Sequence, residues 1–275
     1  MKLLTRILDS APGRWLLLLA VACPPLFAGL GDADCEFHME VRTMTAAQET
    51  WIRQQTDPGA WLIPSWNGAP RVNKPPLTVW LNMLVWSGLD PASAGVDQLV
   101  NRARLVAAAL SVFGVLAVWG IGSLLHSSRF GLLAAAITGT SLLFLRNARM
   151  ASYDTYLLAF STFAVAAALW AMRPRGEPAP PARAAAGWLA CGLAIAAAFL
   201  TKGPISLVMT ALPLALIAAT GPRRWRDGAG LLGALAVAAA LAAPWYLYVL
   251  QAISAADQIM GTEFKAVRTQ FQPPW

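Results

Sequence analysis

Long apolar runs separated by short polar stretches dominate this 275-residue chain. Seven runs have roughly 17 to 25 residues, the length of helix that crosses the hydrocarbon core of a bilayer. They lie at about 14–30, 103–125, 130–146, 153–172, 184–201, 204–220 and 228–250. The first resembles a signal peptide, but Cys23-Pro24-Pro25 interrupts it and no small-residue cleavage site follows, so we expect a retained helix. The pattern predicts an all-α polytopic membrane protein with about seven transmembrane helices.

A further apolar segment, Leu77–Leu89, follows Pro75-Pro76 and has only about a dozen residues, which suits an interfacial helix. If it does not span, the arginine-bearing loops 127–129, 173–183 and 221–227 all face the inside, as the positive-inside rule requires. The outer side then carries the long first loop, 31–102, together with the turns at 146–154 and 201–203.

Composition supports a membrane protein. Hydrophobic residues make up 57% of the chain and charged residues only 13%, whereas a soluble domain has about a quarter of its residues charged. The net charge of +7 does not indicate nucleic-acid binding, because the basic residues form short clusters between apolar runs. The three cysteines and two histidines show no disulfide framework and no metal-ligand spacing.

Two ionisable residues lie at predicted helix ends, where a charge near the membrane is costly and often functional. Asp154 can cap the helix that begins near residue 153, or it can join the arginines before it in a pocket for an anionic headgroup. Lys202 can reach to water as an interfacial anchor, or it can bind phosphate at the turn formed with Gly203-Pro204. Lys74, just before Pro75-Pro76, has the same potential for phosphate binding.

Several short motifs follow one another along the chain. In the first outer loop they are Trp61, Pro64, Asn67-Gly68, Pro70 and Lys74-Pro75-Pro76-Leu77. Further along they are Ala148-Arg149-Met150 followed by Asp154, then Leu200-Thr201-Lys202-Gly203-Pro204, and Pro244-Trp245-Tyr246. Together they resemble the motifs of the GT-C-type membrane glycosyltransferases, in particular the lipid A aminoarabinose transferase and protein O-mannosyltransferase group. The resemblance runs from about residue 14 to residue 275.

This resemblance implies a single transmembrane glycosyltransferase module over 1–275, with 31–102 as its outer catalytic loop. It implies a polyprenyl-phosphate-linked sugar donor, a lipid, glycan or protein acceptor, and transfer with inversion. The expected setting is the cell (inner) membrane, with the active site facing the periplasm or exterior and membrane lipids around it. Glu40 is then the expected base, alone or with Asp154, while Lys74, Lys202 and Arg149 hold the lipid phosphate.

The sequence departs from the family pattern at two positions and in its length. The acidic motif of the first loop aligns best with Met39-Glu40-Val41-Arg42, so Met39 replaces an acid and either Asp34 or Glu36 can substitute for Glu40. Asn73 replaces an acid that has been linked to a metal in relatives; no metal site and no cofactor is assigned, and a divalent cation has little support. Relatives continue beyond this length, so we expect a C-terminally truncated chain.

Two other classes of protein remain as alternatives. A secondary transporter is also polytopic, but it typically has broken helices and charges near the middle of the bilayer. A non-catalytic lipid-binding remnant is the other alternative. The clean helices and terminal charges predicted here favour the transferase.

Overall fold

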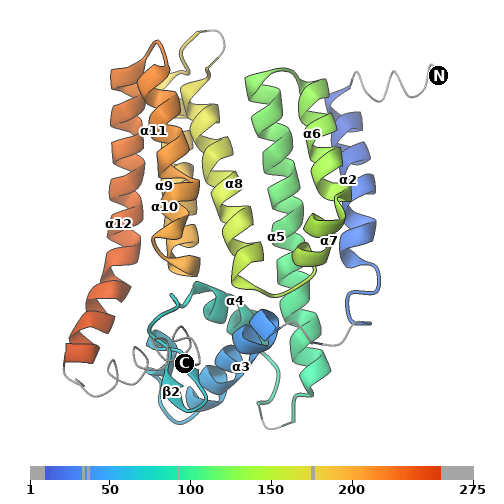
Figure 1. Ribbon diagram of the computed structural model, residues 1–275, viewed down its shortest axis with the longest axis vertical. Coiled ribbons are helices and arrows are strands. Elements are labelled where there is room, and N and C mark those ends of the chain that lie inside the picture. The colour runs from blue at the N-terminus through green and yellow to red at the C-terminus, as the bar shows by residue number, and fades with distance from the viewer. Residues whose placement is uncertain (1–9, 33–34, 36–37, 92, 175–176, 255–275) are drawn as a thin grey trace, which may run out of the picture.

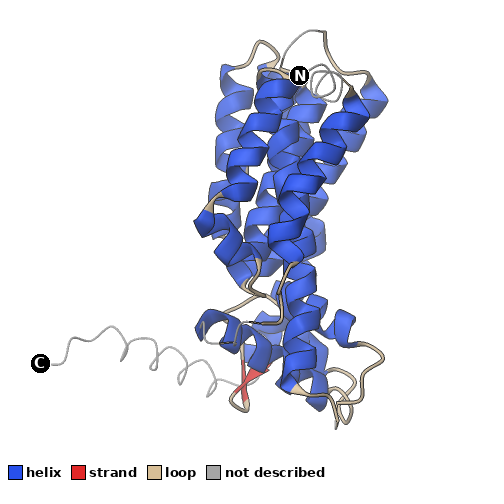
Figure 2. Ribbon diagram, turned by 90° about the vertical axis from the view of Figure 1, so that its right-hand side faces the viewer, coloured by secondary structure: helices blue, strands red, loops and turns tan. Residues whose placement is uncertain are grey.

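The computed structural model describes residues 10–32, 35, 38–91, 93–174 and 177–254, and its helices form a long bundle with a smaller lobe at one end (Figures 1 and 2). The bundle contains α2 (Ala11–Phe27), α5 (Val96–Leu125), α6 (Ser128–Thr140), α7 (Leu142–Ala148), α8 (Tyr153–Met172), α9 (Pro181–Lys202), α10 (Ile205–Met209), α11 (Ala211–Thr220) and α12 (Arg224–Ser254). The lobe contains α3 (His38–Arg53), the short 3₁₀ helix η1 (Ala60–Leu62), the strands β1 (Ser65–Trp66) and β2 (Ala69–Pro70), and α4 (Leu77–Trp86). An all-α polytopic fold is therefore confirmed.

Each of the seven predicted segments contains helix, but not every segment is one span. Within the described residues, α5, α8, α9 and most of α12 are long and apolar enough to cross a membrane, and α6 with α7 makes a fifth span if the bent pair counts as one. The helix α2 and the stretch Ile205–Thr220 are shorter apolar elements. The ten-residue α4 lies in the lobe, so the prediction that Leu77–Leu89 is too short to join the spans is confirmed.

The predicted spans at 130–146 and 204–220 are each interrupted. Between α6 and α7 the chain bends by 68° at Ser141, whose backbone is extended. Between α10 and α11 the cause is Pro213: its ring clashes with the carbonyl four residues earlier, that of Met209, where α10 ends. Both breaks lie on the lobe side of the bundle, so they shape the region around the candidate site (Figure 1).

Small residues let α9 pack closely against its two neighbours. A Cβ on Gly187 would lie 2.7 Å from the Cβ of Ala171 on α8, and one on Gly192 would lie 2.7 Å from the carbonyl oxygen of Ala234 on α12. Close backbone approach of this kind is how helices associate in lipid, where the hydrophobic effect does not drive them together. The packing holds α9 against α8 and α12.

The lobe has its own small core and is attached to the bundle by hydrogen bonds. Trp86 donates from Nε1 to the carbonyl of Leu99 at 2.9 Å, and Trp245 of α12 donates from Nε1 to the carbonyl of Leu62 at 2.7 Å. The Tyr156 hydroxyl of α8 donates to Oδ1 of Asn82 at 2.9 Å, which adds a buried link between the bundle and the lobe. The lobe is therefore held against α5, α8 and α12.

Candidate active site

An ion pair joins the lobe ends of α8 and α9. Asp154 lies in the first turn of α8, and Lys202 is the last residue of α9. The Lys202 ammonium donates to Oδ1 of Asp154. The Asp154 side chain is 53% exposed and that of Lys202 is 25% exposed. The two residues selected from the sequence are thus neighbours, and their charges remain open to solvent.

The loop that carries Lys74 reaches the same place. Gly203, directly after Lys202, has φ +72°, and a Cβ built on it would lie 4.0 Å from Cγ of Pro75 and 3.4 Å from the hydroxyl oxygen of Tyr246. Positive φ favours glycine because it has no Cβ to clash with the backbone. The turn after α9 therefore brings Lys202 against the segment Lys74-Pro75.

Positive charges lie close together around Lys74. Burial lowers the pKa of the Lys74 ammonium below its ordinary value of 10.5, and the charges of Lys202 and Arg71 lower it further, while Asp154 acts in the opposite direction. Among the described residues, Lys74 has no carboxylate within ion-pairing distance. Three cations are thus gathered around one acid, which leaves an excess of positive charge suited to an anion.

Arg71 is a member of this cluster that the sequence did not indicate. It is 5% exposed, and its guanidinium lies 5.6 Å from the ring centroid of Trp66 and 5.5 Å from that of Tyr153. It also donates to the carbonyl of Arg42 at 2.9 Å. The two aromatic rings hold the guanidinium of Arg71, which is always charged, close enough to Lys74 to act on its pKa. The signal was weak, because a single arginine in an irregular loop has no periodicity to mark it as buried.

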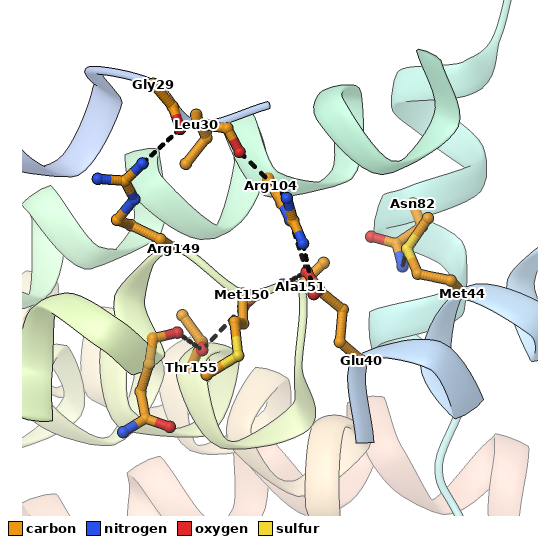
Figure 3. A network of polar contacts seen from close by, with 11 residues as sticks. Gly29, Leu30, Glu40, Met44, Asn82, Arg104, Arg149, Met150, Ala151 and Thr155 are labelled. Carbon is orange, nitrogen blue, oxygen red and sulfur yellow. Dashed lines mark hydrogen bonds and ion pairs between the residues drawn. The ribbon is translucent and has the colours of Figure 1, made fainter. Parts of the chain in front are cut away.

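Glu40 is not placed as a surface base. It is 1% exposed, and both of its oxygens accept from the guanidinium of Arg104 on α5, at 3.0 and 2.9 Å (Figure 3). Its Oε1 also accepts from the backbone N–H of Ala151 at 2.9 Å. Arg104 in turn donates to the carbonyl of Leu30 at 3.2 Å. The prediction of Glu40 as the base is not supported by this geometry, because the carboxylate is enclosed and its oxygens are occupied.

Cys35 lies beside the same pair. Burial raises the pKa of its thiol to about 11, and the neighbouring Glu40 carboxylate contributes to the increase. A thiol in this state stays protonated near neutral pH and is a poor nucleophile. The surroundings of Glu40 thus form a closed structural network.

Arg149 is also engaged elsewhere. Its guanidinium donates to the carbonyl of Gly29 at 2.6 Å (Figure 3) and to that of Pro25 at 3.2 Å, at the end of α2. A cation at a helix C-terminus satisfies carbonyls that have no partner within the helix. The prediction of Arg149 as a phosphate ligand is therefore not supported: its observed contacts cap α2.

The remaining acids give no metal centre in the described part of the chain. Asp34 and Glu36, the alternatives to Glu40, lie outside the described residues. Within the described ranges, no group of three or more His, Cys, Asp or Glu side chains is close enough to hold a metal ion. Asp154 is thus the acid that lies with the lysines.

A largely apolar groove of about 620 Å³ leads into the bundle from the Asp154–Lys202 pair. Its apolar lining includes Phe144 of α7, Leu157 and Leu158 of α8, and Ile205 and Met209 of α10. The breaks after α6 and α10 place these side chains around one opening. The arrangement suits an amphipathic molecule with an anionic head at the lysines and an apolar tail in the groove.

Sequence comparison identifies one matching family. The model of a family described as dolichyl-phosphate-mannose-protein mannosyltransferase matches residues 73–248, which include Lys74, Asp154 and Lys202. An uncharacterized protein of Aquifex aeolicus (strain VF5) is 34% identical over 154 residues, which are 56% of this chain and 28% of that protein.

Two solved structures share the fold. ArnT from Cupriavidus metallidurans bound to undecaprenyl phosphate has a TM-score of 0.65, and the same protein in the apo state has 0.66. In both cases the sequences are 24% identical, and the match covers 87% of this chain and 42% of the other. The chain thus spans less than half the length of the relatives that it matches.

Proposed function

Because this chain belongs to the dolichyl-phosphate-mannose-protein mannosyltransferase family, we propose that it is an integral-membrane glycosyltransferase whose sugar donor is a polyprenyl phosphate. The observation that carries the proposal is the cluster of Lys74, Lys202 and Arg71 around Asp154 at the mouth of the apolar groove. The structure of ArnT bound to undecaprenyl phosphate, a protein of the same fold, supports this choice of lipid.

The lysines bind the donor phosphate in this proposal. Lys74 and Lys202 carry mobile ammonium groups that can donate to phosphate oxygens. Arg71 is buried against aromatic rings, so it adds positive charge without contacting the ligand. The polyprenyl chain lies in the groove between α7, α8 and α10.

Asp154 is the proposed base. As the acceptor oxygen attacks the anomeric carbon, its proton passes to the Asp154 carboxylate and the bond between the anomeric carbon and the phosphate oxygen breaks. The lipid phosphate leaves with both bonding electrons, and Lys74 and Lys202 stabilise its charge. A single displacement of this kind inverts the anomeric configuration. Glu40 acts only by holding Ala151, three residues before Asp154.

The proposed setting is the inner membrane, with the lobe on the periplasmic or exterior side. The loops and the adjoining helix turns at the opposite end of the bundle (Figure 1) carry the arginines Arg129, Arg173, Arg183, Arg223, Arg224 and Arg226. An excess of arginine in short loops marks the cytoplasmic side. The acceptor is a hydroxyl or phosphate of a lipid, glycan or protein that approaches the lobe.

Binding of undecaprenyl phosphate to the purified chain in nanodiscs tests the proposal. A hydrogen bond to a charged group contributes about 1.5–3 kcal/mol, so Lys74→Gln and Lys202→Gln should each weaken binding by about 10- to 100-fold. Arg129→Gln, which removes an exposed charge at the opposite end, should leave binding unchanged. Unaltered binding in both lysine variants would overturn the proposed phosphate site.

A transfer assay in vesicles separates the proposed activity from the other classes. A radiolabelled polyprenyl-phosphate sugar should lose its label to an acceptor when the lobe is on the accessible side. Movement of a soluble solute across the vesicle instead would indicate a transporter, and binding without transfer or transport would indicate a non-catalytic lipid-binding protein.

A further inference from the structure

The proposed function requires two different partners for two residues that are paired with each other. Lys202 must contact the donor phosphate, and Asp154 must be open to the acceptor hydroxyl. In the structure, the Lys202 ammonium instead donates to the Asp154 carboxylate. We infer that Asp154 and the donor phosphate compete for Lys202, so that donor binding releases Asp154 to act as the base. This inference rests on the proposed function.

The backbone on both sides of the pair is fixed, so the exchange needs only side-chain rotation. On α9, the buried Thr201 hydroxyl donates to the carbonyl of Ala197 at 2.7 Å, and the Gly203 N–H donates to that of Phe199 at 2.8 Å. In the first turn of α8, the Thr155 hydroxyl donates to the carbonyl of Asn147 at 2.7 Å. Lysine has four rotatable side-chain bonds, so its ammonium can leave Asp154 without any movement of these anchors.

Electrostatics favour the phosphate over Asp154. An ion pair as exposed as this one stabilises a protein only weakly, because water screens both charges and the long side chain loses freedom. A phosphate beside Lys202 would also lie near Lys74, whose ammonium has no carboxylate within ion-pairing distance among the described residues. The charge of Arg71 acts at the same place. Lys202 therefore exchanges the Asp154 carboxylate for a phosphate that can accept hydrogen bonds from the ammonium groups of both Lys202 and Lys74.

The competition has a consequence for the order of the reaction. Without the donor, Oδ1 of Asp154 accepts from Lys202, and Glu40 cannot replace Asp154 because Arg104 and Ala151 already hold its oxygens. Both oxygens of Asp154 are therefore open to the acceptor only after the donor phosphate has drawn Lys202 away. The pair Asp154–Lys202 thus favours the sequence donor first, acceptor second.

A double-mutant cycle with undecaprenyl phosphate as the probe tests the competition. The dissociation constant is measured in nanodiscs for the wild type, Asp154→Asn, Lys202→Gln and the double variant. Asp154→Asn should tighten binding by up to about fivefold, the equivalent of one exposed ion pair. In the Lys202→Gln background, the same substitution should have no effect, because no ammonium remains to be released.

Two results overturn the inference. One is that Asp154→Asn does not tighten binding in the wild-type background. The other is equal tightening with and without Lys202, which would show simple repulsion between Asp154 and the phosphate. Asp97→Asn is the matched control: it removes one exposed acid at the start of α5 and should leave the dissociation constant unchanged. Failure of the proposed function looks different, because binding would then be insensitive to both Lys74→Gln and Lys202→Gln.

Discussion

Two carboxylate–cation pairs lie at the lobe end of the bundle, and they differ in almost every physical respect. Glu40 and Arg104 form two hydrogen bonds to each other and are 1% and 4% exposed at their side chains. Asp154 and Lys202 form a single contact and are 53% and 25% exposed. The residue types alone do not distinguish the two pairs.

The difference shows which acid is available for chemistry. The oxygens of Glu40 also accept from the backbone of Ala151, so the first pair connects α3, α5 and the chain entering α8. A buried pair of this kind is strongly coupled to the fold, whereas an exposed pair can change partners at little cost. The closed pair is therefore a structural element that positions the open one.

The largest expected effect comes from breaking the closed pair. Glu40→Gln leaves the Arg104 charge buried without a counter-charge, and removing one partner of a buried pair typically destabilises a protein by about 3–5 kcal/mol. We expect a loss of stability of this size, measured by denaturant or thermal unfolding in detergent. Asp154→Asn should change the free energy of unfolding by no more than about 1 kcal/mol.

The control is a double variant that removes both charges. Glu40→Leu with Arg104→Met replaces the pair with apolar side chains, and such replacements are often neutral or stabilising. The double variant should therefore be more stable than Glu40→Gln. Equal losses in Glu40→Gln and Asp154→Asn would contradict the contrast between the closed and the open pair.

Much of the fold could be predicted from the lengths of the apolar runs. Each predicted span contains helix because a run of this length has no other way to satisfy its backbone in lipid. Pro213 is a sequence signal for the break before α11, but hydropathy alone does not detect it, because an apolar run continues through a proline. No proline marks the bend at Ser141.

The candidate site could be predicted only in part. Lys74, Asp154 and Lys202 were selected from their places at predicted helix ends, and the structure brings these ends together. The enclosure of Glu40 could not be predicted, because its partner Arg104 lies 64 positions away and no sequence spacing reveals that contact. Arg71 was missed for a similar reason, because its burial depends on aromatic rings from two separate elements.

A second prediction tests whether the open pair depends on its backbone support. Gly203 has φ +72° and ψ −147°, a region used almost only by glycine, and a Cβ there would lie 3.4 Å from the Tyr246 hydroxyl. Gly203→Ala should destabilise the protein by about 1–3 kcal/mol. It should also weaken undecaprenyl phosphate binding, because Lys202 moves with the turn.

The matched control is another glycine with free space around it. Gly233 lies in the interior of α12 with nothing within 4 Å of a built Cβ. Gly233→Ala should be neutral or stabilise by up to about 1 kcal/mol, because alanine is the better helix former. If both alanine variants behaved alike, the conformation after α9 would not be what holds Lys202 in place.

The smallest expected effect concerns the protonation of Lys74. Its pKa in the free protein is lowered by burial and by the charges of Lys202 and Arg71, so it loses its proton at a lower pH than an ordinary lysine. A bound phosphate favours the charged ammonium and raises this pKa again, so binding takes up a proton and weakens as the pH rises through the lowered value. Undecaprenyl phosphate binding should therefore fall by a few-fold in the wild type as the pH is raised from neutral towards 10.5, the ordinary lysine value.

Lys74→Arg separates this effect from any other titration in the same range. Arginine stays protonated throughout, so the variant keeps the charge but cannot lose it. Its binding should fall less over the interval than that of the wild type, and this difference measures the contribution of Lys74 alone. Parallel pH profiles for the two proteins would mean that the donor phosphate does not contact Lys74. The open pair would then have to bind the phosphate through Lys202 alone.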